Sequence, residues 1–61
     1  MTKRYIADAM VRLVGTTDTY EQRIITWSGP ELAKGDIELE AVRRFRDEGY
    51  ETERVIDIRE D

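Results

Sequence analysis

Apolar and polar residues alternate along the first part of the chain. Between residues 5 and 13 every odd position is apolar, and these positions are Tyr5, Ala7, Ala9, Val11 and Leu13. A period of two predicts a strand with one buried face. Small side chains at the middle of that face leave room for a helix to lie close. The even positions include Ile6, Met10 and Val14, so the second face of this strand is also partly apolar.

The segment 15–19 has the composition of a turn and predicts a hairpin loop. A phosphate-binding loop is the alternative, but this loop has a single glycine, Gly15, and no neighbouring lysine. β-branched and aromatic residues then predict a second strand, Tyr20–Trp27. Ile24 and Ile25 are adjacent in this strand and point to opposite faces, and Trp27 shares the face of Ile25.

One helix is predicted between Ser28 and Gly49. Ser28 and Glu31 have the spacing of a capping box, and Pro30 suits a first helical turn. At the other end, Gly49 follows good helix formers and can take the left-handed conformation that closes a helix.

The middle of this helix leaves two alternatives open. Gly35 is either an interior glycine or a break, after which Asp36 caps a second helix. A continuous helix has the apolar stripe Leu32, Gly35, Leu39, Val42 and Phe45. A restart at Asp36 has the stripe Ile37, Ala41, Val42 and Phe45. Val42 and Phe45 face inward in both, whereas one of Ile37 and Leu39 is left as a flank contact or exposed.

The last strand is predicted at Tyr50–Arg59. We expect one side to carry Tyr50, Thr52, Arg54, Ile56 and Ile58, with the isoleucines facing the helix, and the other to carry Glu51, Glu53, Val55, Asp57 and Arg59. The order is then ββαβ. We predict an α+β, two-layer fold in a single domain, residues 1–61, with a three-stranded antiparallel sheet of order 2-1-3 and one helix packed on one face.

Composition narrows the classes of function. The chain has 61 residues, a formal net charge of -4, no histidine and no cysteine. These absences exclude disulfides, thiolate chemistry and imidazole catalysis. Charged and hydrophobic residues each make up 39% of the chain, and the periodic hydrophobics indicate a folded domain and not an acidic tail. No apolar run reaches the length of a membrane span or a signal-peptide core, so we expect a soluble, intracellular (cytoplasmic) protein.

Two charged clusters are candidates for chemistry. Residues two apart, as in the acidic group Asp36, Glu38 and Glu40, do not share a helix face, and acids near a helix start are favoured by its dipole, so we predict no catalytic role. The basic cluster is Arg43, Arg44 and Arg46. It is a possible anion contact, although helix-surface partners are in reach: Glu40 and Glu48 for Arg44, and Asp47 for Arg43. We predict no cofactor, no metal and no small-molecule substrate.

The sheet face opposite the helix is the strongest functional hint. One helix covers one face only, and the other is predicted to carry an apolar group consisting of Ile6, Met10, Val14, Ile25, Trp27 and Val55. Apolar exposure of this kind marks interaction sites, and Trp and Met are enriched at interfaces. We therefore expect a small non-enzymatic protein-interaction module, homodimeric through this face or bound to a protein partner.

In size, acidity and strand-helix order the chain resembles many small phage-encoded and mobile-element proteins, including some anti-CRISPR inhibitors. The likeness is architectural and assigns no residue. It implies an alternative function, an acidic inhibitor or regulator of a nucleic-acid-binding complex, acting through the acidic C-terminal surface or through the Arg43, Arg44 and Arg46 cluster. The net charge of -4 argues against direct, general binding of nucleic acid.

Overall fold

β1 (Thr2–Leu13) is the central strand of the molecule. In the computed structural model, which describes residues 2–60, it pairs antiparallel with β2 (Glu21–Pro30) on one side and β3 (Tyr50–Glu60) on the other. The helix α1 (Lys34–Asp47) lies between β2 and β3 in the chain. The predicted ββαβ order and the sheet order 2-1-3 are therefore confirmed.

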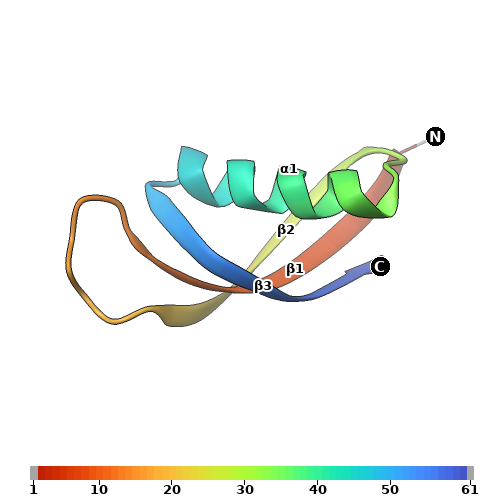
Figure 1. Cartoon of the computed structure of the whole chain (residues 1–61). Coiled ribbons are helices and arrows are strands. Elements are labelled where there is room, and N and C mark those ends of the chain that lie inside the picture. The colour runs from red at the N-terminus through yellow and green to blue at the C-terminus, as the bar shows by residue number, and fades with distance from the viewer. Residues whose placement is uncertain (1, 61) are drawn as a thin grey trace.

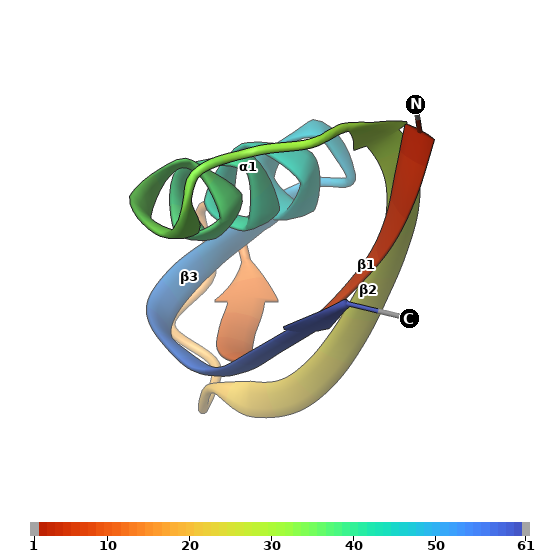
Figure 2. The ribbon, with the colours of Figure 1, turned by 90° about the vertical axis from the view of Figure 1, so that its right-hand side faces the viewer.

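The helix lies across one face of a strongly curved sheet. Figure 1 shows α1 running above the strands, with the β1–β2 loop projecting beyond the end of the helix. Figure 2, at 90° to it, shows the sheet bending around α1, so that the helix occupies the concave side. The convex side of the sheet is not covered by any other element of the described chain.

The core forms where the regular face of β1 meets the helix. Tyr5, Ala7, Ala9 and Val11 are each 0% exposed, as the alternation predicts. From the helix, Ile37, Ala41 and Phe45 complete two adjoining clusters. Small residues at the contact, namely Ala7, Ala9 and Ala41, let the helix backbone approach the sheet. Leu13, the last odd position, is 50% exposed because the hairpin extends beyond the end of α1.

The inward stripe of α1 follows the second of the two predicted patterns. Ile37, Ala41 and Phe45 are the buried residues of the helix, although the helix runs without a break from Lys34 through Gly35. The inward placement predicted for Val42 is wrong, since this side chain is 37% exposed. The predicted stop is confirmed: Gly49 has φ +91°, and its N–H donates to the Arg46 carbonyl over 2.9 Å.

The predicted start of the helix is wrong. Ser28, Gly29 and Pro30 belong to β2, where Pro30 lies opposite Thr2 in the sheet. The helix is capped by Ala33, whose carbonyl accepts from the N–H groups of Asp36 and Ile37, and no side chain caps it. Asp36 lies in the first turn, where the helix dipole favours a carboxylate.

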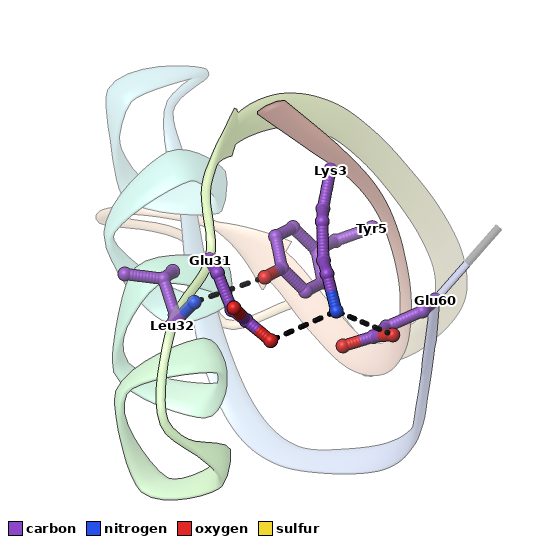
Figure 3. A network of polar contacts seen from close by, with 5 residues as sticks. All are labelled: Lys3, Tyr5, Glu31, Leu32 and Glu60. Carbon is purple, nitrogen blue, oxygen red and sulfur yellow. Dashed lines mark hydrogen bonds and ion pairs between the residues drawn. The ribbon is translucent and has the colours of Figure 1, made fainter. Parts of the chain in front are cut away.

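A network centred on Lys3 and Tyr5 holds the β2–α1 connection in place of a capping box (Figure 3). The Lys3 ammonium lies 2.9 Å from a Glu31 carboxylate oxygen and 3.4 Å from one of Glu60. The Leu32 N–H donates to the Tyr5 hydroxyl over 3.0 Å. Hydrogen bonding to Glu31, then to Glu60, raises the pKa of Lys3. This network joins the first strand to the connection and to the end of the last strand.

The substitution Tyr5→Phe, which removes only the hydroxyl oxygen, tests this network. In Tyr5→Phe the partly buried Leu32 N–H loses its acceptor while the ring keeps its packing, so we expect a loss of about 1–2 kcal/mol of unfolding free energy in a urea titration. Tyr20→Phe is the matched control, because the Tyr20 hydroxyl makes no hydrogen bond within residues 2–60. Equal stability of the two variants would show that the Tyr5 hydroxyl contributes nothing.

The regular alternation predicted for β3 is wrong. Along β1, the register partner changes from Asp57 at Asp8 to Val55 at Ala9, which leaves Ile56 as an extra residue. A second shift follows between Met10 and Val11. Each bulge exchanges the two faces of the strand. As a result Tyr50, Thr52, Val55 and Ile58 all lie opposite odd-numbered residues of β1, and Ile56 is 46% exposed.

Candidate interaction surfaces

Three of the six residues predicted for the reverse face of the sheet lie on the helix side instead. Trp27 is opposite Tyr5, Ile25 is opposite Ala7, and Val55 is opposite Ala9 in the sheet register. Opposite residues share a face, and these β1 residues are buried under α1. The predicted apolar group is therefore not assembled on one surface.

Trp27 is part of the core and is only 6% exposed. Its ring centroid lies 5.5 Å from that of Tyr5, with the two planes tilted by 30°. On its helix side the Arg44 guanidinium lies 5.4 Å from the ring centroid. Trp27 is thus enclosed between the sheet and a helix side chain, and it is not available to a partner.

The remaining three predicted residues are separated from one another. Ile6 and Met10 are half-buried on the reverse face of β1, and Val14 lies just after the end of that strand, 54% exposed. The reverse side also carries Ile24, which is 60% exposed and opposite Asp8. We call this side the convex face; it comprises the even-numbered β1 residues and their register partners.

Most charges on the convex face already have partners within the chain. Arg12 pairs with Glu51, and Arg59 lies 3.4 Å from Asp57. Hydrogen bonding to Glu51 raises the pKa of Arg12. The Gln22 amide donates to one Asp8 oxygen over 2.7 Å, whereas the other Asp8 oxygen is buried without a hydrogen bond. Since its charges are largely matched internally, this face offers little electrostatic selection for a partner.

The predicted arginine cluster is divided between two roles. Arg44 forms an ion pair with Glu40 at 3.1 Å and covers Trp27 as described above, so it stabilises the fold. Arg43 and Arg46 are exposed, and within residues 2–60 neither side chain forms an ion pair or a hydrogen bond. In particular, the predicted pair of Arg43 with Asp47 is not formed. Two guanidinium groups of the cluster therefore remain available.

The outward side of α1 carries an apolar surface that was not predicted as an interaction site. Leu39 is 69% exposed, the highest value among the exposed large hydrophobics, and Val42 is 37% exposed. Residues three apart are neighbours on a helix surface, so these two side chains adjoin. Val42 and Arg46 also line a shallow hollow of about 230 Å³ together with Val14. The sequence did indicate such exposure, because one of Ile37 and Leu39 had to lie off the inward stripe of the helix.

We call this region the outer α1 surface and define it by Gly35, Asp36, Glu38, Leu39, Val42, Arg43 and Arg46. All seven residues are exposed. Their spacing places Gly35, Leu39, Val42 and Arg46 along one stripe. The charged residues Asp36, Glu38 and Arg43 flank that stripe.

Elsewhere, the described residues form no group of three or more side chains suited to hold a metal ion. A hollow of about 350 Å³ lies between the start of α1 and β3 and is lined by Ile37, Ile56 and Ile58 among charged neighbours. Within residues 2–60, no helix has the length and apolar character needed to cross a lipid bilayer.

The ββαβ architecture assigns the domain to the α+β fold class, and it does not by itself indicate a function. Comparisons of the chain with protein-family models, with curated proteins and with solved structures found no match. Functional inference therefore rests on the surfaces described above.

Proposed function

We propose that this chain is a small non-enzymatic protein-interaction module that acts as a homodimer. The observation that carries the proposal is the pair Leu39 and Val42, adjacent on α1 and exposed by 69% and 37%. Contiguous aliphatic exposure on a small domain is typical of an interaction site.

The size of the core supports the same proposal. A chain of 61 residues buries only about 60% of its unfolded surface, so its stability is marginal as a monomer. Association with a second copy removes further apolar area from water and stabilises the folded state by mass action. A homodimer therefore adds the buried apolar area that the small core lacks.

The assignment as a non-enzyme is supported by the roles of its charged side chains. The chain contains no histidine or cysteine. In the acidic group at the start of α1, Glu40 pairs with Arg44, and Asp36 and Glu38 are exposed on the helix surface. These are structural and surface roles. We also propose a reducing, intracellular location, on the ground that the chain has no cysteine to form a stabilising disulfide.

Sedimentation equilibrium of the wild-type chain tests self-association. Over loading concentrations from about 5 to 500 µM, a range that brackets weak, small interfaces, we expect the mass to rise from 7.2 kDa toward twice that value. A mass that stays at 7.2 kDa throughout this range would contradict the proposal.

A further inference from the structure

Charges are ordered along α1. The acidic residues Asp36, Glu38 and Glu40 lie in the first half of the helix, and Arg43, Arg44 and Arg46 lie in the second half. The two charges of opposite sign at the ends of α1 are not on its outer surface: Lys34 lines a hollow beside β3, and Asp47 lines one beside β2. Glu40 and Arg44 neutralise each other. Within the described chain, the other four residues, Asp36, Glu38, Arg43 and Arg46, form no ion pair. The outer α1 surface thus presents an unpaired acidic end and an unpaired basic end.

The exposed aliphatic residues lie between these two ends. Leu39 follows Asp36 by three residues and precedes Arg43 by four, so both charges adjoin it on the helix surface. Val42 follows Glu38 by four residues and precedes Arg46 by four, so these two charges adjoin it in turn. An apolar centre with opposite charges on its two sides is complementary to a copy of itself that runs in the opposite direction.

We propose that two copies of this chain associate through their outer α1 surfaces, with the helices antiparallel about a two-fold axis. This inference rests on the homodimer proposed above and specifies its surface. An interface of this symmetry is self-complementary, since each copy contributes the same residues. The antiparallel arrangement also places the positive end of each helix dipole beside the negative end of the other, which is favourable.

The helix geometry gives the contacts. When Leu39 of one copy lies opposite Val42 of the other, Arg46 comes level with Gly35, and Arg43 comes within two residues of Asp36, which occupies the same flank of the stripe. The arginines of each copy then lie within one turn of Asp36 and Glu38 of the second copy. Gly35, which has no side chain, leaves space for the long Arg46 side chain at that level.

Other occupants fit this surface less well. A parallel pair of helices would place Arg43 and Arg46 against the same residues of the second copy and would repel. An acidic partner of another kind would satisfy the two arginines but not Asp36 and Glu38. A nucleic acid would be repelled by these carboxylates and by the net charge of -4.

The size of the surface sets the strength of the dimer. With 14 residues, α1 is about 21 Å long. One helix face of this length falls at the lower end of specific interfaces, so we expect a reversible dimer with a micromolar dissociation constant. Exposed charges at its rim make it sensitive to salt, and raising the ionic strength should weaken it.

Sedimentation equilibrium of matched variants tests the location of the surface. We expect Leu39→Asp to raise the dissociation constant at least about tenfold, because it places a carboxylate in the apolar centre. Ile24→Asp is the control: Ile24 is 60% exposed, comparable to the 69% of Leu39, but it lies on the convex face. This variant should associate as the wild type does. If Ile24→Asp abolished the dimer and Leu39→Asp did not, the α1 surface would be wrong while self-association remained.

Charge exchange tests the antiparallel arrangement. Arg43→Glu with Arg46→Glu makes one all-acidic variant, and Asp36→Lys with Glu38→Lys makes one basic variant. We expect each alone to be weakened at least about tenfold and a one-to-one mixture to recover a heterodimer. Far-UV circular dichroism verifies that both variants are helical; if either does not fold, the Leu39 and Ile24 comparison decides. Folded variants that fail to pair on mixing would overturn the arrangement.

A final arm separates the dimer from nucleic-acid binding. A labelled single-stranded RNA oligonucleotide is titrated with the wild-type chain, and we expect no binding at physiological salt. Salt-dependent binding that is lost in Arg43→Glu with Arg46→Glu would assign the arginines to nucleic acid and would overturn the inference. Monomeric wild-type chain at every concentration would instead contradict the homodimer itself.

Discussion

The Phe45→Ala variant is expected to lose about 3–5 kcal/mol of unfolding free energy, the usual cost of truncating a buried phenylalanine. Phe45 is 2% exposed and packs with Ala9 and Val11, where the second half of the helix meets the sheet. A domain of this size has a total stability of only about 3–9 kcal/mol. The expected loss is therefore at least about a third of the total stability, and at the lower end of that range it leaves the variant unfolded at 25 °C.

A urea titration followed by far-UV circular dichroism measures this loss. Leu39→Ala is the matched control, because it truncates a large side chain on the same helix that is 69% exposed. At a concentration low enough to keep the chain monomeric, its stability should change by less than about 1 kcal/mol. A Phe45→Ala midpoint equal to that of the wild type would contradict the packing of α1 on the sheet.

The Trp27→Ala variant is expected to be as severe, with a loss of about 3–5 kcal/mol. Trp27 is 6% exposed and is held between the Tyr5 ring at 5.5 Å and the Arg44 guanidinium at 5.4 Å. Its removal leaves a cavity between sheet and helix and also removes the aromatic face from under Arg44. Both effects lower the free energy of unfolding.

This variant separates a core role from an interface role. Trp27→Phe keeps an aromatic ring on Tyr5 and should lose markedly less stability than Trp27→Ala. Ile24→Ala, on the same strand and 60% exposed, should leave the urea midpoint almost unchanged. If Trp27→Ala kept the wild-type midpoint but lost self-association, Trp27 would belong to an interface and its placement in the core would be wrong.

The central strand and the fold class were predictable because burial imposes a simple pattern there. β1 has neighbours on both edges and the helix above it, so its odd positions from Tyr5 to Val11 had to be apolar. The end of the helix was also predictable, since Gly49 takes a positive φ that other residues rarely adopt.

The face that β2 presents was not predictable from its own residues. Ile24 and Ile25 are adjacent aliphatics, and either could face the core. The register that pairs Ile25 with Ala7 and Trp27 with Tyr5 depends on the length and path of the hairpin loop. A register change of one residue exchanges the faces, so a local pattern with aliphatics on both sides does not decide between them.

The helix start and the faces of β3 depend on partners distant in the chain. Ser28 and Pro30 have the local pattern of a helix start, but they pair instead with the first residues of β1. In β3, the bulge at Ile56 breaks the alternation and moves Val55 to the helix side. Long-range pairing overrides local preference at both places, and it also removed Trp27 and Val55 from the predicted interaction face.

The most direct test of the proposed dimer surface is a dilution series followed residue by residue by amide chemical shifts in ¹H–¹⁵N NMR spectra. We predict concentration-dependent shifts at Gly35, Leu39, Val42, Arg43 and Arg46, and none at Ile6, Met10 and Ile24 on the convex face. Shifts confined to the convex face, or no shifts at any residue up to millimolar concentration, would contradict association through the helix.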